Sequence, residues 1–288
     1  MPAARTGAAA RERRPRREPP ERKPRRRSDL FQRILVAVPL ALATIIFIDL
    51  GGLPYALFMI AAGLICLHEL YRLLARWRPV SLVGFAALVA MVLAARSGGQ
   101  GGVLEVMVAA VPVVLVAVLI TDPPRPTVAI AGTLFGIYYI GVAFAHTELL
   151  RQLDHGNGVM IDVLVGTFVG DTGAYLGGRL FGRRPLAPRI SPNKTVEGLF
   201  CGILAAVIAV FIAGLYQTWL TQGQALLLGL AVALLGPLGD LFESLVKRDA
   251  GAKDAGTLFG PHGGILDRID SALFTVVVGY YIWLSVVH

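Results

Sequence analysis

The stretch VEGLFCGILAAVIAVFIAGLY, residues 196–216, contains a single charged residue, Glu197. An apolar run of about 20 residues is long enough to cross a bilayer as a helix. Comparable runs recur from residue 32 to the C-terminus, separated by Gly, Pro and Asn turn signals. We therefore predict nine membrane-spanning helices, at about 32–50, 53–73, 79–96, 103–121, 127–147, 159–178, 196–216, 224–243 and 264–287. The sequence indicates an all-α, polytopic integral membrane protein.

The overall composition excludes an ordinary water-soluble fold. Of the 288 residues, 55% are apolar and 16% are charged, whereas soluble domains carry about 25% charged residues. The two cysteines, Cys66 and Cys201, show no CxxC or Cys/His spacing, so neither a disulfide framework nor a zinc site is expected. We interpret both as small apolar helix residues.

A strongly basic arm precedes the first apolar run. Residues 1–30 hold 11 of the 27 Lys and Arg residues and four acidic ones, so this arm carries +7 of the formal net charge of +8. A segment this rich in Arg, Pro and Glu is expected to be disordered. No aromatic platform or basic helix accompanies it, which argues against nucleic-acid binding. We interpret it as a cytoplasmic arm that can also contact anionic lipid headgroups.

The positions of the cations predict the orientation in the membrane. With the N-terminus inside, 25 Lys and Arg residues fall on the cytoplasmic side, and only Arg96 and Arg151 fall outside. Two inner connections, at about 179–195 and 244–263, are long, polar and rich in Gly and Pro, as functional loops often are. The chain is thereby divided into three regions: the arm 1–30, the N-terminal helices 31–158 and a catalytic region 159–288.

Three segments are rich in residues that can bind ligands or take part in catalysis. The first lies in the span 159–178 and continues to Arg179. Asp171, Tyr175 and Arg179 recur every four residues, so they share one helix face. An acidic residue inside a span is a candidate functional group. The alternative is a buried ion pair between Asp171 and Arg179 or another Arg. Asp162, nine positions earlier, falls on the opposite face and is expected to lie outside this site.

The second segment is SPNKTVEG, residues 191–198. Hydroxyls of Ser191 and Thr195, the ammonium of Lys194 and free backbone N–H groups at a helix start would suit phosphate oxygens. The alternative is a plain helix cap at the membrane surface, formed by Thr195 or Ser191. The segment alone favours neither interpretation.

The third segment, residues 239–271, is the richest in ionisable groups. Helical spacing predicts two polar faces: Asp240, Glu243, Ser244 and Lys247 on one helix, and Asp267, Asp270 and Ser271 on the next. A hairpin between these helices would bring the acidic faces together. A Mg²⁺ ion shared with phosphate oxygens would relieve the repulsion, and Lys and Arg would meet the remaining phosphate charge.

A network of interfacial salt bridges is the alternative interpretation of the third segment. It accounts for the charge balance but not for the glycines at 256, 260, 263 and 264, which suggest a backbone bending closely around a ligand. His262 by itself is more typical of a structural or solvated histidine than of a base.

The sequence SLVKRDAGAKDAGTLFGPHGGILDRID, residues 244–270, resembles without a break the signature of the CDP-diacylglycerol synthase family. Members of this family are also called phosphatidate cytidylyltransferases. The surroundings of Asp171 and the segment 191–198 are similar to further motifs of the family. The resemblance covers about 160–285, whereas the first five spans match only in topology and the arm does not match.

The resemblance implies that CTP and phosphatidic acid react to give CDP-diacylglycerol and pyrophosphate, with Mg²⁺ as the cofactor. It implies metal ligands at Asp240 and Asp267, with Asp270 and Asp171 nearby, and family members are also described with a K⁺ ion. The residues expected to act in catalysis are Asp240, Asp267, Lys247, Arg268 and Asp270. Those expected to bind substrate are Ser191, Lys194, Thr195, Arg248, Lys253, His262, Asp171 and Tyr175.

The implied partners are CTP, phosphatidic acid and membrane lipids, in a bacterial plasma membrane with the site facing the cytoplasm. A homodimer is compatible with the sequence. Two other functions stay open. One is a CTP-dependent transferase acting on another lipid phosphate, such as a polyprenol or an archaeal ether lipid. The other is an ion-coupled transporter, although the polar segments lie toward one surface and no internal repeat is found.

Overall fold

The computed structural model describes residues 28–256 and 263–287, with side chains from residue 39 onward and up to 286. The helices are α1 (Ser28–Leu50), α2 (Gly52–Leu73), η1 (Ala75–Trp77), α3 (Ser81–Thr121), α4 (Pro126–Gly136), η2 (Ile137–Gly141), α5 (Val142–Gln152), α6 (Gly156–Phe181), α7 (Val196–Gly214), α8 (Gln222–Asp249) and α9 (Leu266–Val287). Two short strands, β1 (Pro185–Ala187) and β2 (Ser191–Thr195), form an antiparallel hairpin between α6 and α7.

Within residues 28–256 and 263–287, seven helical segments are long and apolar enough to cross a membrane, with α4, η2 and α5 counted together as one segment, 126–152. This confirms the predicted class of an all-α polytopic membrane protein. The exception is the β1–β2 hairpin, which corrects one prediction. Residues 191–195 form a strand and not the start of a helix. Thr195 instead caps α7, because its hydroxyl oxygen accepts a hydrogen bond from the Gly198 N–H at 3.1 Å.

Helix α3 is a helical hairpin and not one long rod. Gly99 breaks it with a left-handed φ of 59°, which glycine adopts at little cost. A Cβ atom at Gly102 would lie 2.8 Å from the carbonyl oxygen of Ala94, although eight residues of continuous helix would separate the two by about 12 Å. The two arms of α3 correspond to the separate spans predicted at 79–96 and 103–121.

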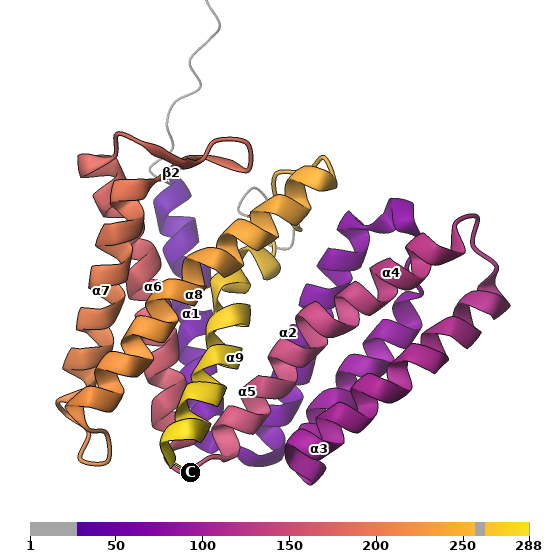
Figure 1. The fold of residues 1–288 in the computed structure, drawn as a ribbon, viewed down its shortest axis with the longest axis horizontal. Coiled ribbons are helices and arrows are strands. Elements are labelled where there is room, and N and C mark those ends of the chain that lie inside the picture. Colours follow the sequence, from indigo (N-terminus) through magenta and orange to yellow (C-terminus); the bar gives the residue numbers. More distant parts are fainter. Residues whose placement is uncertain (1–27, 257–262, 288) are drawn as a thin grey trace, which may run out of the picture.

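The helices form two neighbouring groups, which Figure 1 shows side by side. Helices α6 to α9 pack together in one group, and α2 to α5 pack together in the other. Helix α5 packs against α9 and joins the groups, while α1 contacts both α2 and α6. Each group therefore buries apolar side chains within itself and along this joint.

Small residues let α6 and α7 approach closely. A Cβ atom at Gly177 would overlap the side chain of Cys201, and one at Gly173 would overlap Ala205. Close backbone approach at small residues is typical of helix pairs in membranes. Cys201 and the buried Cys66 are both free thiols, as the sequence predicts.

The polar groups separate to opposite ends of the helices. The β1–β2 hairpin, the end of α8 and the start of α9 share the upper end in Figure 1. At the other end, Arg96 pairs with Glu148 on α5 at 3.2 Å, and Arg151 donates to the carbonyl oxygen of Ile48 at 2.7 Å. These are the two arginines that the charge count places apart from all the others.

Candidate functional site

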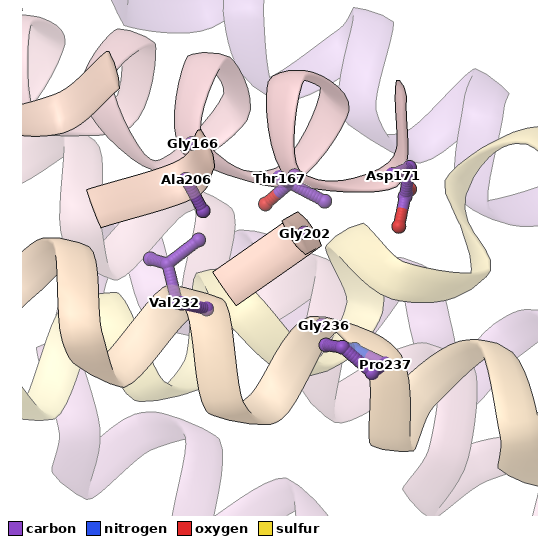
Figure 2. Close-up of a pocket in the computed structure, with 10 residues that line it drawn as sticks. Gly166, Thr167, Asp171, Gly202, Ala206, Val232, Gly236 and Pro237 are labelled. Carbon is purple, nitrogen blue, oxygen red and sulfur yellow. The ribbon is translucent and has the colours of Figure 1, made fainter. Parts of the chain in front are cut away.

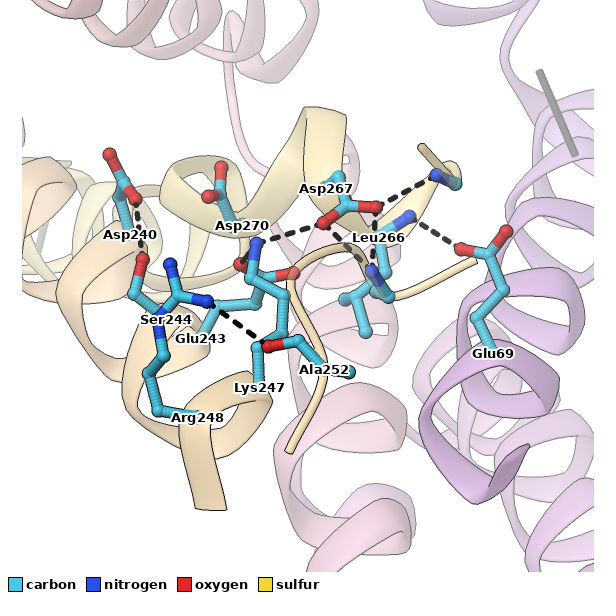
Figure 3. Close-up of polar contacts among 12 residues, drawn as sticks. Glu69, Asp240, Glu243, Ser244, Lys247, Arg248, Ala252, Leu266, Asp267 and Asp270 are labelled. Atoms are coloured by element: carbon cyan, nitrogen blue, oxygen red, sulfur yellow. Dashed lines mark hydrogen bonds and ion pairs between the residues drawn. The ribbon is translucent and has the colours of Figure 1, made fainter. Parts of the chain in front are cut away.

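The centre of the candidate site is the junction of α8 and α9, drawn in Figure 3. Lys247 donates to Asp267 Oδ1 at 2.8 Å and also pairs with Glu243, one turn earlier on its own helix. The side chains of all three are largely buried, with 12% of Lys247, 10% of Asp267 and 2% of Glu243 exposed. The hairpin thus brings the two acidic faces together, as their helical spacing predicts.

Asp267 is held by backbone as well as by Lys247. Its carboxylate accepts hydrogen bonds from the N–H groups of Ala255 and Gly264, each at 2.8 Å. Gly263 precedes this contact with a φ of 84°, a left-handed conformation that a residue with a Cβ adopts at a cost. Ala255 and Gly264 therefore both lie against the first turn of α9.

Asp240 lies two turns before Lys247 on α8 and pairs with Lys194 of β2 at 2.5 Å. Its other carboxylate oxygen is 3.4 Å from the hydroxyl of Ser244. Lys194 thus connects the β1–β2 hairpin to α8. This contact gives the second polar segment a role at the site besides the cap formed by Thr195.

Asp171 and Asp270 are two further carboxylates at the site. The Ser271 hydroxyl donates to Asp171 at 3.4 Å, which links α6 to α9. Asp171 also borders a narrow crevice between α6, α7 and α8, lined mainly by glycines and small apolar residues (Figure 2). The alternative of an Asp171–Arg179 ion pair is not found among the described residues, and the Arg179 guanidinium instead donates to Tyr175 at 3.4 Å.

Five carboxylates therefore gather at this end of α6, α8 and α9, and we call them the carboxylate cluster: Asp171, Asp240, Glu243, Asp267 and Asp270. Asp270 is close enough to Asp171, Asp240 and Glu243 for their negative charges to repel one another. Lys194 and Lys247 offset part of this repulsion. The arrangement favours the binding of a further cation or of a ligand that brings one.

Glu69 on α2 is a member of the site that the sequence analysis missed. Its carboxylate accepts hydrogen bonds from the N–H groups of Ile265 at 3.2 Å and Leu266 at 2.9 Å, at the start of α9 (Figure 3). Cβ atoms at Gly256 and Gly264 would overlap this carboxylate. At these two positions the backbone bends closely around Glu69, so this carboxylate accounts for the glycines there. The sequence signal that could have identified Glu69 is that it is an isolated acidic residue within an apolar helix.

The remaining predicted residues lie around the cluster or away from it. Arg248 is exposed and donates to the carbonyl oxygens of Ile190 and Ala252, each at 3.2 Å. Lys253 and Arg268 are exposed on the loop and on the first turn of α9, and Ser191 is half-buried at the start of β2.

Tyr175 is 64% exposed and is not brought to the cluster. His262 lies outside the described residues. Asp162 lies apart, with Gln217 donating to it at 2.9 Å.

Comparison with known proteins gives one consistent result. A model of the cytidylyltransferase family matches residues 31–286. The phosphatidate cytidylyltransferase of Bacillus subtilis (strain 168) is 33% identical over 263 residues, which cover 88% of this chain and 97% of the relative. The proteins of the same name from Staphylococcus epidermidis (strain ATCC 12228 / FDA PCI 1200) and Staphylococcus aureus (strain N315) are 32% and 33% identical. Each match covers 82% of this chain and 93% of the relative.

Proposed function

The chain belongs to the cytidylyltransferase family, and from this membership we infer that it is a nucleotidyltransferase that transfers CMP from CTP to phosphatidic acid. A phosphate oxygen of phosphatidic acid attacks the α-phosphorus of CTP. The bond from that phosphorus to the bridging oxygen breaks, and pyrophosphate leaves with the bonding electron pair. The products are CDP-diacylglycerol and pyrophosphate. The observation that carries this proposal is the carboxylate cluster with its two lysines, in a chain similar to phosphatidate cytidylyltransferases over most of its length.

We propose that Mg²⁺ binds at Asp240 and Asp267, with Asp171 and Asp270 beside them. Mg²⁺ is usually bound by one or two carboxylates, while substrate phosphates and waters supply the other ligands. Carboxylate oxygens are the right donors, and the repulsion around Asp270 favours a cation. Bound there, Mg²⁺ would neutralise phosphate charge as the pyrophosphate leaves.

The chain's own part in the reaction is positioning and charge neutralisation. Lys194 and Lys247 already hold their ammonium groups against Asp240 and Asp267, where they can turn to the phosphates of CTP and of the lipid. Arg248, Lys253 and Arg268 are exposed around the rim and can meet the outer phosphates. Holding two phosphates in line beside these cations lowers the barrier without a covalent intermediate.

We also propose nine membrane spans, with the N-terminus and the carboxylate cluster on the cytoplasmic side. The hairpin form of α3 and the gathering of cations at one end support this topology. Phosphatidic acid would then enter sideways from the bilayer, and CTP from the cytoplasm. The bacterial sources of these relatives support a bacterial plasma membrane as the location.

The purified protein in detergent tests this function directly. Supplied with CTP, phosphatidic acid and Mg²⁺, it should form CDP-diacylglycerol, measured by mass spectrometry of the lipid fraction. Polyprenyl phosphate and an archaeal ether-lipid phosphate serve as competing acceptors in parallel reactions. Preferential reaction of either one would contradict phosphatidic acid as the substrate. The absence of any nucleotide-dependent lipid product would contradict the transferase itself.

A further inference from the structure

Glu69 reaches the site from the other group of helices. It lies on α2, 196 and 197 positions before the two residues whose N–H groups it accepts. Only 5% of Glu69 is exposed, so its carboxylate is removed from water. A buried carboxylate is costly unless it is hydrogen-bonded. The two N–H groups at the start of α9 meet that requirement.

The location of these N–H groups makes the contact specific. The first N–H groups of a helix have no acceptor within the helix, and a negative charge beside them is favourable. Leu266 is the first residue of α9, and Asp267 is the next. Whatever fixes the first turn of α9 therefore also fixes the carboxylate that Lys247 contacts at 2.8 Å.

Two glycines of the α8–α9 connection lie against this carboxylate. Gly256 and Gly264 both lie against it so closely that a methyl group at either position would overlap its atoms. The backbone of the α8–α9 connection thus contacts Glu69 from two sides. Neither glycine is among those with a left-handed φ, so the close approach itself explains why no larger residue fits.

A second contact from the same end of α2 holds the other end of the loop. Arg76, in η1 directly after α2, donates to the carbonyl oxygen of Asp249 at 2.6 Å and to its carboxylate at 3.1 Å. Asp249 is the last residue of α8. This end of α2 and η1 therefore contacts both the last residue of α8, through Arg76, and the start of α9, through Glu69.

We propose that Glu69 is a positioning residue for the transfer reaction, acting through the first turn of α9 on Asp267 and Lys247. The N-terminal helices are then part of the framework of the active site and not only a membrane anchor. This inference rests on the proposed function. Because a displacement of about 1 Å at a reacting centre can cost about a hundredfold in rate, loss of this contact should reduce kcat far more than the KM for CTP.

The test compares Glu69→Gln and Glu69→Ala with the wild-type protein, at a temperature well below the Tm of each. Gln has the same shape but only one acceptor oxygen, so it can keep one of the two hydrogen bonds. We expect kcat to fall about tenfold in E69Q and about a hundredfold in E69A. Hydrogen exchange at Ile265 and Leu266 should become faster in the same order.

Glu148→Gln is the matched control. Glu148 is also buried, at 1% exposed, and bonds to Arg96 and Gln152 at the opposite end of the molecule. We expect E148Q to lower the Tm but to leave kcat unchanged. If E69Q behaves in the same way, with lower Tm and normal kcat, Glu69 only stabilises the fold and the proposal is overturned.

A double-mutant cycle with Gly264 is a second, independent test of the contact between Glu69 and the start of α9. Gly264→Ala should impair kcat because the added methyl group meets the Glu69 carboxylate. In an E69A background that space is free, so the same methyl group should cost little further activity. Fully additive effects would contradict the proposed contact. An inactive wild-type protein would contradict the proposed function instead, and hydrogen exchange at the start of α9 would still test the role of Glu69.

Discussion

Lys247 at the end of α8 donates a hydrogen bond to Asp267 in the first turn of α9, with 2.8 Å between Nζ and Oδ1. The same ammonium pairs with Glu243, whose side chain is 2% exposed. A single lysine thereby pairs with two largely buried carboxylates on two helices. Lys247 therefore contributes both to the stability of the protein and to its activity, and mutations can separate these two contributions.

Replacing Lys247 by Met should destabilise the protein and abolish activity. Removing one partner of a buried ion pair costs about 3–5 kcal/mol, because the remaining charge is left uncompensated. The double variant Glu243→Gln with Lys247→Met removes the Glu243 charge, while Asp267 keeps its hydrogen bonds from the Ala255 and Gly264 N–H groups, so it should recover much of the lost Tm. It should stay inactive, because no ammonium is left to meet phosphate. Thermal unfolding and product formation, measured on both variants, check this. Recovery of activity together with Tm would show that Lys247 is only structural.

Asp240→Asn should leave the fold intact and reduce turnover by about a hundredfold or more. The Asp240 and Lys194 side chains are 31% and 25% exposed, so losing their ion pair should cost less stability than losing the more deeply buried pair of Lys247 and Glu243. Asp162→Asn is the matched control, because Asp162 bonds to Gln217 away from the cluster. That variant should keep its activity. Normal turnover in D240N would remove Asp240 from the site.

Removal of divalent cations should stop the reaction without unfolding the protein. The ion pairs of Lys194 and Lys247 keep the cluster partly neutralised when no metal is bound. EDTA should therefore abolish formation of CDP-diacylglycerol and leave the Tm nearly unchanged, and added Mg²⁺ should restore turnover. Activity that persists in excess EDTA would contradict a metal requirement.

Gly177→Ala should loosen the packing of α6 against α7. The added methyl group overlaps the Cys201 side chain, and overpacking of this kind costs about 1–3 kcal/mol. The Tm in detergent should fall, and a Cys201→Gly change in the same protein should restore it. Gly223→Ala is the control, because nothing lies within 4 Å of a methyl group there. Equal Tm values for G177A and G223A would contradict the close contact.

The sequence predicted those parts of the molecule that depend on local spacing. Uninterrupted apolar runs identify the helices, since a bilayer requires that length. Helical spacing predicted that Asp240 and Lys247 share one helix face and that Asp267 and Asp270 share another, and the Lys247–Asp267 contact joins these two faces. The turn at Gly99 was also readable, because Gly98 and Gly99 interrupt a long apolar stretch.

Contacts between distant segments were not predictable in this way. Nothing local to Glu69 indicates that its partners are Ile265 and Leu266, because only tertiary packing brings α2 to the start of α9. Tyr175 shares a helix face with Asp171, but spacing does not say how far neighbouring helices cover that face, and Tyr175 is exposed. The strand at 191–195 forms because it pairs with residues 185–187. Helix-capping signals in the sequence do not indicate such a pairing.

The most direct test of the central claim follows each phosphorus atom of CTP. The wild-type protein is supplied with phosphatidic acid, Mg²⁺ and CTP labelled either at the α- or at the γ-phosphate. The account predicts that the α-label enters the lipid fraction while the γ-label appears in pyrophosphate, in a ratio of about one to one set by the single bond exchanged at the α-phosphorus. Transfer of the γ-label to lipid, or no transfer of either label, would contradict it.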